Sequence, residues 1–94
     1  MSEVERTVLI TNKRGLHARA SAKFVTLAAN QPCEVKVRKD DGGSGGTVTG
    51  TSIMGLMMLG AAMGDSIIIS AAGDGADVAV GTLCELVEAK FGED

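Results

Sequence analysis

Cys33-Glu34-Val35-Lys36-Val37-Arg38 alternates apolar with charged residues along its whole length. Successive side chains of a β-strand point to opposite faces, so this pattern predicts a strand with one face in a core and the other in water. Three further segments rich in β-branched residues predict the rest of the sheet. They are 4–10, with Val8 and Ile10 on one face; 47–51; and 65–71, whose three consecutive isoleucines predict an interior strand.

Helices are expected between these strands. Residues 18–29 are rich in helix formers, and Pro32 follows closely enough to end the helix. The apolar positions expected to share one face at helical spacing are Ala18, Ala22, Val25 and Ala29. Ser52 stands before an apolar run and is a natural N-cap for a short helix that reaches Leu59.

A third helix is expected at the end of the chain. Asp74 and Asp77 resemble a helix N-terminal cap. The apolar stripe that follows at helical spacing comprises Val80, Leu83, Cys84, Val87 and Phe91. The order is then βαββαβα, and the economical packing is an α+β, open-faced two-layer β-sandwich: a four-stranded, mainly antiparallel sheet with three helices on one face.

The glycine-rich residues 40–46 lie between the second and third predicted strands. No Walker lysine follows them, so they predict a flexible hairpin connection and not a phosphate cradle.

The size and composition of the chain exclude several classes of protein. Its 94 residues suffice for one domain spanning 1–94 but are too few for an enclosed substrate cavity. There is no tyrosine or tryptophan, which removes the usual stacking platform for single-stranded nucleic acid. The N-terminus has no secretory pattern and no apolar run is as long as a membrane span. We therefore expect a cytoplasmic protein with no membrane insertion and no nucleic-acid partner.

Basic residues are concentrated in the first forty positions, although the net charge is −3. The eight that lie there are Arg6, Lys13, Arg14, Arg19, Lys23, Lys36, Arg38 and Lys39. No acidic residue interrupts the stretch from Lys13 to Lys23. Such a patch would attract phosphate or the acidic surface of a partner protein and speed their encounter, while an ordinary solvated face is the plainer alternative.

The cysteines do not indicate a reactive or metal site. Cys33 and Cys84 lack CxxC spacing and fall on apolar positions of a predicted strand and helix, which predicts two buried free thiols. Core-facing thiols could not pair with a surface histidine as a Cys-His nucleophile. One histidine without a close cysteine pair cannot close a metal site, so neither a metal nor a cofactor is expected.

The only histidine, His17, lies where the first strand ends and the alanine-rich helix begins. The start of a helix exposes unpaired backbone N–H groups and carries partial positive charge, so a phosphoryl group on the imidazole would meet ready donors. Arg19, two residues along, adds a guanidinium. This combination favours a phosphohistidine site, although a lone histidine at a helix start is more often only a helix-entry residue.

Two segments in this order resemble a known family. Gly15-Leu16-His17-Ala18-Arg19, followed by Ser52-Ile53-Met54-Gly55-Leu56, resembles HPr, the histidine phosphocarrier of the bacterial phosphoenolpyruvate-dependent phosphotransferase system. The resemblance covers nearly the whole chain and implies the same fold. One departure is Ala20, where the family most often has proline. Proline would fix the first helical turn, whereas alanine leaves an additional N–H.

The resemblance implies a non-enzymatic carrier. His17 would accept a phosphoryl group on Nδ1 from phosphorylated enzyme I and pass it to an EIIA-type acceptor. Arg19 and the backbone N–H groups of Ala18 and Arg19 would bind its oxygens. The implied partner-docking residues are Ala20, Lys23, Phe24, Ile53, Met54 and Met57, while Met58 is expected to face inward. A relay protein must offer one surface to successive partners, so a monomer is expected.

The resemblance also implies regulation at Ser52, which an HPr kinase/phosphorylase would phosphorylate. The segment 51–56 resembles the kinase-regulated version of the family, whereas Asn12-Lys13-x-Gly15 resembles its nitrogen-related branch, so sugar transport and nitrogen regulation both stay open. The main alternative function is a regulatory binding module that is controlled at Ser52 and has little or no phosphotransfer. Ala20 gives this alternative some weight.

Overall fold

A computed structural model of the chain describes residues 3–41 and 46–93. Its elements in chain order are β1 (Glu3–Leu9), α1 (Ala18–Ala29), β2 (Val35–Lys39), β3 (Thr47–Thr49), α2 (Ile53–Met58), β4 (Ser66–Ala72), α3 (Ala76–Glu88) and a 3₁₀ turn, η1 (Lys90–Gly92). The predicted order βαββαβα is confirmed. Residues 42–45, the centre of the predicted flexible hairpin connection, lie outside the described residues.

The four strands form one antiparallel sheet in the order β1-β4-β2-β3. β4 lies between β1 and β2, as its consecutive isoleucines predict. Val37 on β2 stands opposite Ile69 on one side and Val48 on the other, which fixes the register between the three strands. The alternation that begins at Cys33 is confirmed from Val35, where β2 starts: Val35 and Val37 are buried, and Lys36 between them is exposed.

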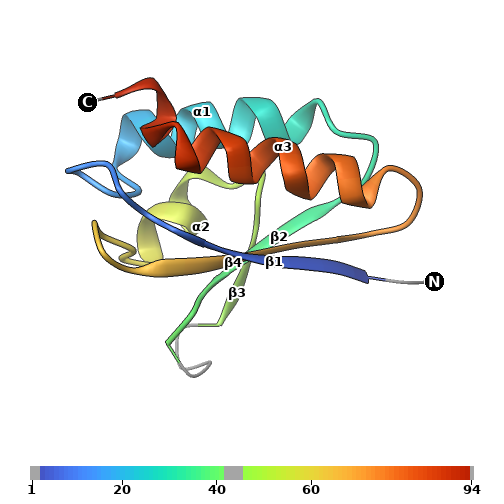
Figure 1. Cartoon of the computed structure of the whole chain (residues 1–94), viewed down its shortest axis with the longest axis horizontal. Coiled ribbons are helices and arrows are strands. Elements are labelled where there is room, and N and C mark those ends of the chain that lie inside the picture. Colours follow the sequence, from blue (N-terminus) through green and yellow to red (C-terminus); the bar gives the residue numbers. More distant parts are fainter. Residues whose placement is uncertain (1–2, 42–45, 94) are drawn as a thin grey trace.

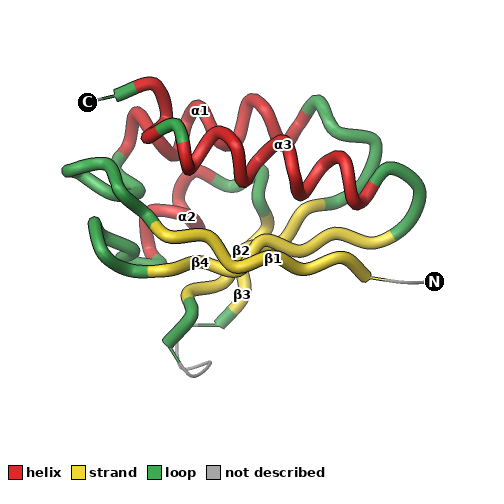
Figure 2. The backbone as a smooth tube through the Cα atoms, viewed as in Figure 1, coloured by secondary structure: helices red, strands yellow, loops and turns green. Residues whose placement is uncertain are grey.

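Helices α1 and α3 lie side by side over one face of the sheet, as Figures 1 and 2 show. α3 packs on β1 and β4, and α2 contacts α1 and β3. The other face of the sheet is open, and there Arg38 Nη1 lies 3.0 Å from Glu5 Oε2. This arrangement confirms the predicted open-faced α+β sandwich. Within the described ranges, no helix has the length and apolar character needed to cross a membrane.

The core lies between the helices and the covered face of the sheet. Its largest fully buried side chains are Phe24, Phe91, Ile10, Leu56, Ile67, Ile69, Leu83, Val35, Val37, Val80 and Val87. Cys84 is also buried, as predicted, whereas Cys33 precedes β2 and is only partly buried. Burial raises the pKa of the Cys84 thiol, so this thiol stays protonated.

Three details of the helices differ from the prediction. The buried face of α1 is formed by Ala20, Ser21, Phe24 and Ala28, while Ala18 and Ala29 are exposed. Phe24 has far more apolar surface than any alanine, so its burial sets the rotation of the helix. The N-cap of α3 is Gly75 and not Asp74, and no side chain caps this helix; Phe91 is buried but belongs to η1, after α3 has ended.

Candidate functional site

The loop between β1 and α1 is held by a compact set of contacts. Asn12 is fully buried, and its Nδ2 donates to Gly15 O at 2.9 Å. Leu16 N donates to Ala61 O at 3.0 Å, which ties the loop to the segment before β4. Gly15 has φ +61°, and a Cβ there would lie only 2.5 Å from Ala61 O. Only glycine fits this close approach without a backbone shift, so the contact with Ala61 requires glycine at position 15, two residues before His17.

His17 is the N-cap residue of α1. Its backbone is extended, with φ −75° and ψ −179°, and its side chain makes no capping hydrogen bond. Its carbonyl accepts the bond from Ser21 N at 2.9 Å. Ala18, Arg19 and Ala20 come before Ser21 in the chain, and their N–H groups are among those that a helix leaves without a partner inside the helix at its start. The imidazole therefore stands beside backbone donors, as the sequence predicts.

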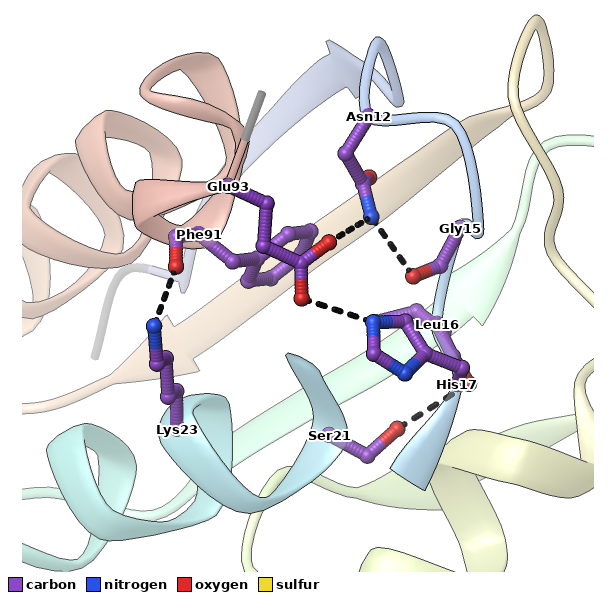
Figure 3. A network of polar contacts seen from close by, with 8 residues as sticks. All are labelled: Asn12, Gly15, Leu16, His17, Ser21, Lys23, Phe91 and Glu93. Atoms are coloured by element: carbon purple, nitrogen blue, oxygen red, sulfur yellow. Dashed lines mark hydrogen bonds and ion pairs between the residues drawn. The ribbon is translucent and has the colours of Figure 1, made fainter. Parts of the chain in front are cut away.

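Glu93 completes the site from the far end of the chain. Its Oε2 lies 2.7 Å from His17 Nε2, and its Oε1 accepts from Asn12 Nδ2 at 3.1 Å. Figure 3 shows the carboxylate between the imidazole and the Asn12 amide. Partial burial acts to raise the pKa of the Glu93 carboxyl, but the hydrogen bonds from His17 and Asn12 and the charges of His17 and Lys23 outweigh it and lower this pKa.

A left-handed turn delivers Glu93 to this place. Lys90 and Phe91 have φ values of +58° and +56°, and Gly92 follows with +75°. Left-handed backbone is costly for non-glycine residues and persists only where other contacts hold it. Here the fully buried ring of Phe91 anchors the turn, and Lys23 Nζ donates to Phe91 O at 2.7 Å.

The His17 side chain is 20% exposed and opens into a shallow surface hollow of about 260 Å³. The other residues that line the hollow are Lys13, Arg14, Arg19 and Glu93. Three cations and one carboxylate give it a positive balance, which suits an anion such as a phosphoryl group. Neither cysteine lines the hollow, and across the described part of the chain no group of three or more histidine, cysteine, aspartate or glutamate residues is placed to hold a metal ion.

The residues expected to dock a partner separate into two groups. Ile53, Met54 and Met57 are 41%, 70% and 42% exposed, so the outward placement predicted for them is confirmed. Met58 is 79% exposed, and the inward placement predicted for it is wrong. In this short helix only Leu56 turns fully into the core, which leaves the flanking methionines outside.

The prediction that Ala20 and Phe24 dock a partner is wrong. Both are fully buried, because they are one helical turn apart on the face of α1 that packs on the core. Lys23 is exposed, although its Nζ is bonded to Phe91 O. Ser52 is the N-cap of α2, as predicted, and its Oγ accepts from Gly55 N at 2.9 Å.

Glu93 is the residue of the candidate site that sequence reasoning missed. It lies 76 positions from His17 along the chain, so no local motif links the two. Only the burial of Phe91, which the apolar pattern does predict, hints that the chain end folds back over the domain.

Comparison with known proteins points to one family. The family model described as PTS HPr component phosphorylation site matches residues 4–89. The phosphocarrier protein NPr of Shewanella violacea is 39% identical over 93 residues, which cover 99% of this chain and 98% of that protein. The phosphocarrier protein HPr of Neisseria meningitidis is 46% identical over 92 residues, covering 96% and 97%. The crystal structure of HPr-C-His from Thermoanaerobacter tengcongensis aligns with a TM-score of 0.84 at 42% identity, covering 100% of this chain and 99% of that one.

Proposed function

The chain belongs to the HPr family of phosphotransferase-system phosphocarriers, which carry a phosphoryl group and are not enzymes, and on that premise we propose that His17 is the carrier residue of this protein. The observation that carries the proposal is the setting of the imidazole. Nε2 is engaged by Glu93, which leaves Nδ1 for the phosphoryl group, at the start of α1 and above a hollow lined by Lys13, Arg14 and Arg19.

Phosphoryl transfer needs an in-line nucleophile and compensation for negative charge spread over three oxygens. A neutral imidazole supplies the nucleophile, and the product is labile enough to pass the group on. The planar guanidinium of Arg19 suits two of the oxygens, and the N–H groups of Ala18 and Arg19 suit a third. These contacts form while the phosphoryl group is being transferred, so the site does not need a deep pocket.

We further propose phosphorylated enzyme I as the donor and an EIIA-type protein as the acceptor. Ile53, Met54 and Met57 form an exposed apolar patch, defined here as the docking patch. Thioether side chains are flexible and suit a surface that binds several partners in turn. Lys23 adds a positive charge for acidic partners.

Ser52 is proposed as the regulatory site for an HPr kinase/phosphorylase. It is partly exposed and lies at the start of α2, next to the docking patch. A dianion there would be tolerated at a helix N-terminus, yet it would bring charge into an apolar surface and repel acidic partners.

Intact-mass analysis after incubation with phosphoenolpyruvate and enzyme I tests the carrier function. The expected product is heavier by one phosphoryl group that is lost in acid, and His17→Ala is expected to accept none. No acid-labile adduct in this incubation, together with an acid-stable adduct at Ser52 in a parallel incubation with ATP and HPr kinase/phosphorylase, would instead favour the regulatory binding module. Transfer of the labile group from this product to an EIIA-type protein would identify the acceptor class.

A further inference from the structure

We propose that Glu93 is a positioning residue for His17, whose carboxylate orients the imidazole and balances the positive charge that the ring gains during transfer. This inference rests on the carrier function proposed above and adds a residue that lies beyond the matched residues 4–89.

The contact between the two side chains assigns a role to each ring nitrogen. An ionised carboxylate only accepts hydrogen bonds, so at 2.7 Å from Glu93 Oε2 the Nε2 atom of His17 must donate. The proton is then on Nε2, and Nδ1 holds the lone pair. Nδ1 lies on the side of the ring that faces α1, away from the carboxylate (Figure 3). A half-turn of the ring about its Cβ–Cγ bond would break this contact, so Glu93 selects one ring orientation.

Glu93 is itself held in place by independent contacts. Its second oxygen accepts from Asn12 Nδ2, and Asn12 is fully buried. The left-handed turn before it is fixed by the buried Phe91 ring and by the bond from Lys23 to Phe91 O. The Glu93 side chain is only 17% exposed. A carboxylate free at the surface would populate several rotamers, whereas these contacts hold the Glu93 carboxylate in one rotamer.

The carboxylate is the one acidic group among the five residues that line the hollow. The cations there, Lys13, Arg14 and Arg19, suit the phosphoryl oxygens, but none of them can stabilise a positively charged ring. During transfer the Nδ1 lone pair forms the new bond to phosphorus, and the bond from phosphorus to the donor atom breaks with its electron pair going to the donor. The proton stays on Nε2, and the resulting positive charge on the ring faces Glu93.

The test compares Glu93→Ala, which removes the acceptor and the charge, with Glu93→Gln, which keeps an acceptor oxygen and removes the charge. Glu34→Gln is the matched control, because it also removes one carboxylate, at an exposed position just before β2. Each variant serves as the substrate of enzyme I, and kcat and KM are measured separately. Nitrogen-15 spectra of the single histidine report the proton on Nε2 in the unphosphorylated protein.

Glu93→Ala is expected to lower kcat about tenfold with little change in KM, since a charge-assisted contact is lost and the docking patch is untouched. The kcat of Glu93→Gln is expected to be about threefold lower than that of the parent protein, and the kcat of Glu34→Gln is expected to equal the parental value. The Nε2 proton is expected to exchange slowly with solvent in the parent protein and quickly in Glu93→Ala. The proposal would be overturned if kcat of Glu93→Ala equals that of the parent protein, including the case in which the variant changes only KM.

The same assay separates this inference from the carrier function. An acid-labile phosphoryl group that still forms on His17→Ala would refute the carrier function itself. If no acid-labile phosphoryl group forms on His17→Ala but it forms at the parental rate on Glu93→Ala, only the role of Glu93 would be refuted.

Discussion

Gly15→Ala is expected to lower the free energy of unfolding by about 2 to 5 kcal/mol. Two costs contribute to this value. At φ +61° an alanine pays about 1 to 2 kcal/mol for left-handed backbone. The added Cβ would also lie 2.5 Å from Ala61 O and 2.7 Å from Ala62 Cα, both backbone atoms, so the loop must move at a further cost of about 1 to 3 kcal/mol.

Gly60→Ala is the matched control. Gly60 has φ +69°, yet a Cβ there would have no atom within 4 Å outside the adjoining residues, so only the backbone cost of about 1 to 2 kcal/mol applies. Both variants restrict the unfolded chain equally, and that effect cancels in the comparison. Urea unfolding followed by circular dichroism gives both values. Equal destabilisation of the two variants would refute the close approach between the His17 loop and residues 61–62.

Three further outcomes are expected. Arg19→Ala should slow transfer from enzyme I about fivefold to tenfold without abolishing it, because one charged contact to the phosphoryl oxygens is lost; unchanged stopped-flow kinetics would remove Arg19 from the site. Ser52→Asp should weaken donor binding and leave the melting temperature nearly unchanged, because aspartate also caps helices and can accept from Gly55 N; a large drop in melting temperature with unchanged affinity would make Ser52 purely structural. The bond from Ala62 N lowers the pKa of the Asp65 carboxyl. Its stabilising effect is therefore complete above the ordinary aspartate pKa of about 3.9 and is lost as pH falls through the lower folded value, so acid unfolding curves of Asp65→Asn should be less steep in that range.

Much of the fold could be predicted because its strands carry period-two patterns and its helices carry local stop and cap signals. β2 has one face in water, and β4, buried between two neighbours, shows three isoleucines in a row. Rotation of the helices about their axes was harder to predict. Counting alanines placed the wrong face of α1 inward, whereas the single large side chain, Phe24, decides it.

The local half of the site could also be predicted. His17, Arg19 and the start of α1 are contiguous in sequence, so their meeting requires only that a helix begin at Ala18. Glu93 reaches His17 through a left-handed turn at two non-glycine residues, a conformation for which the sequence carries no local signal. Tertiary packing of Phe91 imposes that turn, and so the second half of the site appears only in three dimensions.

Nitrogen-15 and phosphorus-31 spectroscopy of the histidine-labelled, phosphorylated protein tests the central claim most directly. The chain has one histidine, so only two ring nitrogens can respond. The account predicts coupling between phosphorus and Nδ1 of His17, with the proton remaining on Nε2. Coupling of phosphorus to Nε2, or a phosphorylated protein in which neither ring nitrogen couples to phosphorus, would contradict it.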